Sequence, residues 1–267
     1  MLSDVSLVVL LGLVGLAVGS FLNVVIDRLP HDQSLLHPPS HCPHCQHPLS
    51  VLDLVPVLSY LWLRGRCRYC GTPIPWRLPL VEALTGLLFA YTGSVWGASL
   101  LTLVSLLYLS TLVVIFFTDL EEGLILNKVV YPATALALVL APWGPAGEGF
   151  GLWQELGRWQ GLAQALAGSA LGFLLMLVIY LAARGGLGFG DVKLGGLLGM
   201  ALGLSRVSVA LPVSFISGGL VAGALLLLRI KGRREAIPFG PFLVGGAIVT
   251  LFWGPEIYEW YRGLFGS

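Results

Sequence analysis

The amino-acid sequence predicts an all-α membrane protein that crosses the bilayer several times. Of its 267 residues, 56% are hydrophobic and only 11% are charged, and the mean hydropathy is +0.86. Soluble domains carry about 25% charged residues and rarely exceed about half apolar ones. The net charge is +1 and there is no basic run suited to nucleic acid, so the charge pattern does not indicate a nucleic-acid partner.

Apolar segments follow one another along the whole chain, and we predict about eight transmembrane helices. The first segment has no positively charged leader before it and is long enough to span a bilayer, so it is interpreted as a retained helix. The fourth and sixth are short for a span of about 20 residues, and we expect them to tilt or to be partly buried in the bundle. The segments are 5–26, 78–96, 99–117, 128–142, 162–183, 191–203, 206–230 and 238–254.

The distribution of lysine and arginine predicts the orientation of these helices. With the N-terminus outside, the basic residues gather on the cytoplasmic side, as the positive-inside rule requires. The inner set is Arg28, Arg64, Arg66, Arg68, Arg77, Lys128, Arg184, Lys193, Arg229, Lys231, Arg233 and Arg234, and the outer set is Arg158, Arg206 and Arg262. The same threading places the insert 27–77 in the cytoplasm.

All four cysteines lie in this small insert after the first helix, together with the five histidines. They form two Cys-x-x-Cys pairs, Cys42 with Cys45 and Cys67 with Cys70, and two such turns can surround one zinc ion tetrahedrally. An insert of about fifty residues cannot build a stable core alone, so a structural zinc makes physical sense. Two disulfides or a dithiol redox site are the alternatives, although a cytoplasmic location disfavours stable disulfides.

The histidines around the first cysteine pair allow a variant of this site. One of them could replace a cysteine as a ligand, but a simpler interpretation is that they are polar loop residues beside the metal. They are His37, His41, His44 and His47.

Two aspartates, Asp119 and Asp191, stand at the edges of long apolar runs and on the same predicted side of the membrane. A carboxylate at a membrane border is costly and is therefore usually functional. Asp191 follows Gly188-Phe189-Gly190, and glycines allow another backbone to approach closely. Two adjacent carboxyl groups can share a proton, so that one activates a water while the other polarises a scissile carbonyl. The pair predicts an intramembrane aspartyl peptidase.

Each aspartate also has an ordinary structural interpretation. Asp119 and Glu122 have the spacing of a helix capping box, and Asp191 could be a plain N-cap. Lys193 could tune the carboxyl pair or could simply extend its ammonium group to the interface. A presenilin-like peptidase is a second hypothesis, although Thr118 stands where that class has tyrosine. A transporter or scaffold with a zinc-stapled loop is a third.

The sequence closely resembles the type IV prepilin peptidases, bacterial leader peptidase/N-methyltransferases. The matching stretches run in order over nearly the whole chain. They are Gly19–Ile26 with Arg28-Leu29-Pro30, Cys42–Cys45, Asp53–Leu61, Arg64–Gly71, Pro79–Glu82, Asp119-Leu120, Gly188–Leu194 and Pro238–Phe242. One departure is that this chain reads Ile125-Leu126-Asn127 where the family often has a proline before the next span.

The resemblance implies a function and a location. It implies that Asp119 and Asp191 form the catalytic pair, that the four cysteines bind Zn²⁺, and that the protein lies in the bacterial inner membrane. Its substrates would be type IV prepilins and type II secretion pseudopilins. Cleavage after a leader glycine would be followed by methylation of the new N-terminal amine from S-adenosylmethionine.

The site of methyl transfer is not visible in the residues. The insert is too short for a Rossmann domain and lacks its glycine fingerprint. The amine must lose a proton to attack a methyl group, so a carboxylate near the site is expected. Asp27, Asp53 and Glu82 are candidates, with ion pairs to Arg28, Arg64 or Arg77 as the structural alternative. The predicted organisation is thus a first helix 1–26, the zinc-binding insert 27–77 and a peptidase core 78–267.

Overall fold

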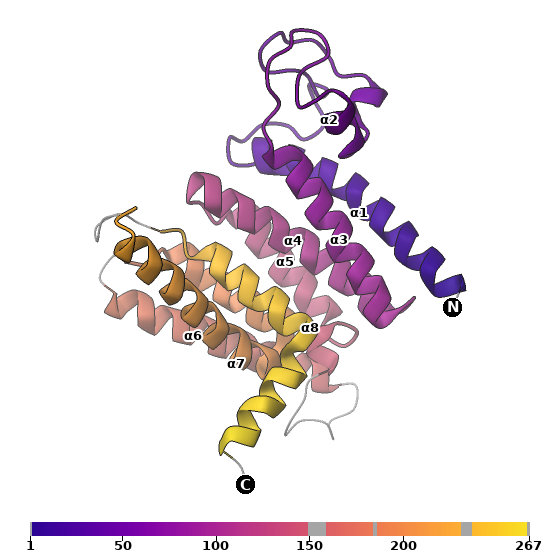
Figure 1. Cartoon of the computed structure of the whole chain (residues 1–267). Coiled ribbons are helices and arrows are strands. Elements are labelled where there is room, and N and C mark those ends of the chain that lie inside the picture. Colours follow the sequence, from indigo (N-terminus) through magenta and orange to yellow (C-terminus); the bar gives the residue numbers. More distant parts are fainter. Residues whose placement is uncertain (1, 149–158, 184–185, 231–236, 266–267) are drawn as a thin grey trace. The chain divides into compact units, whose positions relative to one another are not determined.

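The computed structural model describes residues 2–148, 159–183, 186–230 and 237–265, and every regular element in them is a helix (Figure 1). The elements are α1 (Leu2–Arg28), η1 (Val51–Leu54), α2 (Leu58–Trp62), α3 (Arg77–Trp96), α4 (Leu100–Glu122), α5 (Asn127–Leu140), η2 (Pro145–Glu148), α6 (Trp159–Ala182), α7 (Phe189–Leu227) and α8 (Gly240–Phe265). The chain divides into two compact units, Met1–Val114 and Ile115–Ser267. Five of the basic residues used to predict the orientation, Arg158, Arg184, Lys231, Arg233 and Arg234, lie outside the described residues.

Six of the described helices are long and apolar enough to cross a membrane: α1, α3, α4, α6, α7 and α8. The all-helical multi-pass class is therefore confirmed, whereas the predicted eight segments do not appear as eight separate long helices. Two physical reasons account for the difference. Helix α5 has only 14 residues, and the predicted segments 191–203 and 206–230 form the two arms of α7, which meet at a backbone kink at Gly203, so the predicted boundary there is confirmed.

Helix α7 changes direction at Gly203, where φ is +79° and ψ is 169°. This backbone conformation favours glycine, because a side chain there would clash with the main chain. Asp191, before the bend, interacts electrostatically with Asp119, whose carboxylate is bound by Gly240 N–H. Gly218, after the bend, lies against Phe239, the residue before Gly240. Asp191 and Gly218 thus lie at one level on either side of the bend, so the two arms of α7 run antiparallel.

In the first unit, α1 and α3 lie side by side and pack through glycine (Figure 1). A Cβ added at Gly15 would lie 2.8 Å from Gly86 Cα, and one added at Gly19 would lie 2.7 Å from Glu82 Cα. Such contacts require small residues, because the two backbones approach more closely than side chains allow. Gly15 and Gly19 therefore let α1 and α3 pack closely. Gly219 and Gly223 on α7 have no comparable contact, because a Cβ added at either would meet no described atom within 4 Å.

The second unit is built around the last turns of α4 with α5 to α8, and α6 and α7 pack through Gly168 and Gly199. Its fully buried apolar side chains come from all five of these helices and include Ile115, Val130, Met176, Leu194, Leu198, Leu211, Leu243 and Leu251. Helix α8 bends at Trp253, two residues before Pro255, because proline cannot complete the helical hydrogen-bond ladder (Figure 1). The helix continues eleven residues beyond the predicted end at 254.

Candidate active site

Asp119 lies in the last turn of α4 and is 5% exposed. Its Oδ2 accepts a hydrogen bond of 2.9 Å from the backbone N–H of Gly240, the first residue of α8. A Cβ added to Gly240 would lie 2.5 Å from that same oxygen, so only glycine fits there without displacing the carboxylate. The capping-box interpretation of Asp119 is wrong, because such a box begins a helix and Asp119 ends one.

Asp191 lies in the first turn of α7 and is 7% exposed. Its Oδ2 accepts a 3.1 Å hydrogen bond from the backbone N–H of Gly188, the residue that caps the helix. Asp191 is therefore the third residue of the helix and not its N-cap, so that alternative is wrong in detail. Its other oxygen, Oδ1, is buried and has no hydrogen-bond partner. A buried carboxylate oxygen without a donor is costly and needs a reason.

The two aspartates come together within the second unit. Asp191 interacts electrostatically with Asp119, although 72 positions separate them in the chain. Each carboxylate is held through one oxygen by a glycine N–H at a helix start, Gly188 for Asp191 and Gly240 for Asp119. Helix starts carry partial positive charge, so both carboxylates are oriented by fixed backbone donors. This arrangement can hold a polar group, such as a water, between two acids.

Lys193 does not contact either aspartate through a hydrogen bond or ion pair in the described residues. Its ammonium group donates to Oδ1 of Asn127 and lies 5.6 Å and 5.9 Å from the ring centres of Phe189 and Tyr131. Asn127 belongs to the stretch in which this chain departs from the proline typical of the resembling family. The Lys193 ammonium group is thus held by Asn127 and lies near the two aromatic rings.

The four cysteines converge in the insert, with all four sulfurs within 4.8 Å of one another. Cys42 Sγ and Cys70 Sγ lie 3.8 Å apart, which matches the edge of about 3.8 Å in a tetrahedron of sulfurs around zinc at about 2.3 Å. Both pairs form the same turn: Cys42 N–H donates to His47 O and Cys67 N–H donates to Thr72 O. The sulfurs therefore fit a zinc ion, and no described histidine belongs to the cluster.

The electrostatics of the cluster also suit a cation. Hydrogen bonds from the Thr72 hydroxyl and backbone lower the pKa of the Cys70 thiol to about 6, which favours the thiolate that binds metal. At Cys45 the backbone hydrogen bond of His47 lowers the pKa of the thiol, but desolvation and the sulfurs of Cys42 and Cys70 raise it to about 11. A cation among the four sulfurs would relieve this repulsion.

The three carboxylates predicted as candidates for methyl transfer occupy different environments. Asp27 forms an ion pair of 2.5 Å with Arg77, and the Asp27 side chain remains 54% exposed. Glu82, on α3, accepts a 2.7 Å hydrogen bond at Oε2 from the backbone N–H of Val57. The ion-pair alternative is therefore confirmed for Asp27 with Arg77, while Glu82 binds backbone instead of an arginine.

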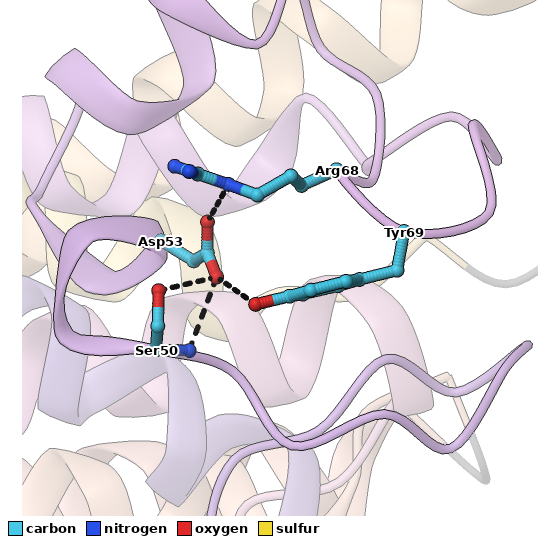
Figure 2. A network of polar contacts seen from close by, with 4 residues as sticks. All are labelled: Ser50, Asp53, Arg68 and Tyr69. Atoms are coloured by element: carbon cyan, nitrogen blue, oxygen red, sulfur yellow. Dashed lines mark hydrogen bonds and ion pairs between the residues drawn. The ribbon is translucent and has the colours of Figure 1, made fainter.

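Asp53 is enclosed by its own neighbours, as Figure 2 shows. Its Oδ2 accepts hydrogen bonds from Ser50 N at 3.0 Å, Ser50 Oγ at 2.7 Å and Tyr69 Oη at 3.1 Å, and its Oδ1 lies 2.7 Å from Arg68 Nε. Burial alone would raise the pKa of Asp53, but these hydrogen bonds and the Arg68 charge lower it. Asp53 links η1 to the second cysteine turn, and its ion-pair partner is Arg68 instead of the predicted arginines.

Sequence reasoning missed two features of these sites. The backbone donors of Gly188 and Gly240 were not assigned, although both lie in stretches that match the resembling family. Spacing cannot indicate a backbone N–H whose partner is 121 residues away, as Gly240 is from Asp119. The bond between Glu82 and Val57 was missed for the same reason.

Comparisons with known proteins agree with this architecture. Residues 13–96 match the family described as "Bacterial Peptidase A24 N-terminal domain", and residues 106–227 match "Type IV leader peptidase family". No solved structure matches the chain.

Curated relatives match almost the whole chain and share the printed name "Prepilin leader peptidase/N-methyltransferase". The one from Aeromonas hydrophila is 36% identical over 278 residues, covering 93% of this chain and 91% of the relative. The relative from Bacillus subtilis is 32% identical, and the match covers 92% of this chain and 94% of the relative. The relative from Pseudomonas putida is 33% identical, and the match covers 94% of this chain and 92% of the relative. None of these three relatives bears the name of a presenilin-like peptidase or of a transporter. The chain therefore belongs to the type IV leader peptidase family.

Proposed function

We propose that this protein cleaves the leader peptide of type IV prepilins and type II secretion pseudopilins at the cytoplasmic border of the inner membrane, and then methylates the new N-terminal amine. The observation that supports the cleavage most directly is the pair of buried, electrostatically interacting carboxylates Asp119 and Asp191. The printed names of the relatives support prepilin cleavage and N-methylation by similarity.

In the proposed cleavage, the two aspartates hold one water and the scissile carbonyl between them. One carboxylate takes a proton from the water as its oxygen attacks the carbonyl carbon, and the other, protonated, donates to the carbonyl oxygen. The unpartnered Oδ1 of Asp191 is free to accept from this water, because Oδ2 is already bound by Gly188. The tetrahedral intermediate then collapses. The departing amine takes the proton that the first aspartate received from the water, and the second aspartate takes its proton back from the hydroxyl group.

The position of the pair supports cleavage at the membrane border and not within the bilayer. Asp119 ends α4 and Asp191 begins α7, and both helices are candidate spans. A substrate with a polar leader followed by an apolar helix would present its junction at that level. We retain the orientation with the N-terminus outside, and we retain eight crossings, counting α5 and the two antiparallel halves of α7.

For the second activity, the four cysteines would hold Zn²⁺ as a structural ion, and S-adenosylmethionine would supply the methyl group. The acceptor amine must be neutral, so a nearby carboxylate has to take its proton. Asp27 and Glu82 remain candidates for this role. Half of the Asp27 side chain is exposed, and hydrogen bonds from Val57 N–H and the Ser20 side chain hold the Glu82 carboxylate in place. The contacts of Asp53 favour a structural role.

The test is a cleavage assay with purified full-length protein in detergent, a prepilin substrate and labelled S-adenosylmethionine. Asp119→Asn and Asp191→Asn are each expected to abolish leader removal while circular dichroism stays unchanged. Glu122→Gln, in the same turn of α4 as Asp119 and exposed, is the matched control and should cleave normally. Full cleavage by either asparagine variant would contradict the proposed catalytic pair.

Product mass separates the two activities, because leader loss and methyl gain are different mass changes. If leader loss proceeds and methyl gain is absent, the peptidase assignment stands and the transferase assignment fails.

A further inference from the structure

The insert exposes a set of large apolar side chains that the proposed chemistry does not use. On the short helix α2, Leu58 is 59% exposed, Leu61 is 63% exposed and Trp62 is 57% exposed. Positions i, i+3 and i+4 lie on one face of a helix, so these three side chains form a single apolar face. We call it the α2 face. Exposed contiguous apolar surface of this kind marks an interaction site.

The depth of α2 is fixed by a contact with a transmembrane helix. Val57, the residue before α2, donates its backbone N–H to Glu82 Oε2 on α3. Glu82 stands five residues after Arg77, so it lies about 7.5 Å along α3 from the start of that helix. It also packs beside Gly19 of α1, nine residues, or about 13 Å, before α1 ends at Arg28. The first turn of α2 therefore starts beside membrane helices and not beyond their ends.

The backbone at this junction is specific. Val57 has φ of +60°, a conformation that a β-branched residue rarely adopts. Such geometry persists only when its surroundings hold it: Leu58 N–H donates to Pro56 O at 2.6 Å across Val57, and Glu82 accepts the Val57 N–H. The orientation of α2 relative to α1 and α3 is thus set by the fold.

Basic side chains follow directly on the α2 face. Arg64 and Arg66 are exposed and form no ion pair with a described residue. Trp62 beside arginines is the composition of segments that lie in the membrane interface, where the ring sits at the headgroup level and guanidinium groups reach lipid phosphates. Each arginine near an anionic surface adds electrostatic attraction to that surface.

The geometry points to α2 as an interfacial anchor: its apolar face enters the headgroup boundary of the leaflet on the insert's side, and Arg64 and Arg66 bind anionic lipid phosphates. Helix α2 begins beside the apolar helices α1 and α3, and the charge that flanks its face is complementary to anionic lipid, so a bilayer is favoured over an apolar segment of a protein substrate. The anchor holds the cysteine insert at the membrane surface, independently of what the insert does.

Photo-cross-linking of the full-length protein in nanodiscs of phosphatidylethanolamine and phosphatidylglycerol tests this anchor. Benzoylphenylalanine replaces Leu61 in one variant and the exposed His44, between the first two cysteines, in a matched control. Mass spectrometry after irradiation is expected to find lipid adducts at position 61 at least fivefold above those at position 44. Equal yields at both positions, or none at position 61, would overturn the proposal.

Two further measurements test the anchor, one by tryptophan quenching and one by removal of the two arginine charges. Quenching by lipids brominated near the headgroup should be greater for the unmodified protein than for Trp62→Phe, and equal quenching would contradict the anchor without any need for a cross-linker. The double variant Arg64→Gln and Arg66→Gln should lower the yield at position 61 at least threefold in anionic nanodiscs and leave it unchanged in purely zwitterionic ones. If added prepilin displaces the lipid adducts and becomes cross-linked instead, the face is a substrate site and the lipid assignment is wrong.

Discussion

Asp53 in the insert and Asp191 at the start of α7 occupy the same position in the same local motif. Each is the third residue of its helical turn, and each accepts the backbone N–H of the capping residue, from Ser50 at 3.0 Å and from Gly188 at 3.1 Å. The difference lies in the other oxygen. Asp53 Oδ1 meets the Arg68 guanidinium at 2.7 Å, whereas Asp191 Oδ1 is buried without a donor.

This contrast indicates how a carboxylate that only caps a helix can be distinguished from one that we propose to be catalytic. A capping carboxylate accepts the backbone N–H with one oxygen, so its second oxygen can contact whatever group lies nearby. In the insert, an arginine and a tyrosine complete the shell, as they would around a structural acid. At Asp191 the neighbour is another acid, Asp119, which destabilises the ionised pair unless a proton or a water is shared between them. The capping position of Asp191 is therefore compatible with its proposed catalytic role.

The largest effect that can test this comparison is on the cleavage rate. Asp191→Asn keeps an oxygen for Gly188 and removes the charge, so we expect the helix to remain and cleavage to fall by about 10²- to 10⁴-fold, the usual contribution of a general acid or base. Asp53→Asn makes the same chemical change in the same motif, and we expect cleavage within about threefold of the unmodified protein. Initial rates of prepilin processing at equal folded concentrations measure both. Similar losses in the two variants would remove the distinction.

A second test concerns the glycine that holds the partner acid. Gly240→Ala places a Cβ 2.5 Å from Asp119 Oδ2, so the carboxylate must move and we expect kcat to fall about 10- to 100-fold with KM nearly unchanged. Gly245→Ala on the same helix meets no described atom within 4 Å and serves as the control. Steady-state kinetics of leader cleavage distinguish the two. If Gly240→Ala raises KM alone, Gly240 contributes to substrate binding and not to the orientation of Asp119.

The comparison also explains what the sequence could and could not predict. The helical class, the cysteine cluster and the two aspartates were predicted because hydrophobic runs, Cys-x-x-Cys spacing and carboxylates at apolar borders are local signals. The break in α7 was predicted as well, because the apolar segments 191–203 and 206–230 were separated at Gly203, where the structure bends. Two long-range hydrogen bonds were not predicted. The bonds from Gly240 to Asp119 and from Val57 to Glu82 join residues 121 and 25 positions apart through backbone N–H groups, which every residue but proline offers.

A third test measures how much Asp53 contributes to the stability of the insert. Asp53→Asn loses the charge that pairs with Arg68, and removing a hydrogen-bonded charge partner costs about 1–3 kcal/mol. We expect the insert to unfold at lower denaturant concentration and to release zinc correspondingly sooner, measured with a chromophoric chelator. Because the pKa of Asp53 is lowered in the folded insert, its contribution is present above the unfolded pKa and is lost as pH falls through the folded pKa. The difference between the variant and the unmodified protein should therefore shrink in acid.

The smallest expected effect comes from Tyr69, which joins Asp53 to the first cysteine turn. Its hydroxyl donates to Asp53 at 3.1 Å and its ring lies 3.7 Å from that of His47, measured between centroids. Tyr69→Phe keeps the ring contact and removes one hydrogen bond, so we expect about 1 kcal/mol of destabilisation by the same zinc-release measurement. In combination with Asp53→Asn its effect should fall below the sum of the single effects, because both changes remove the same bond. Additive losses would mean that Tyr69 supports the cysteine turns through its ring alone, and that Asp53 is held by Ser50 and Arg68.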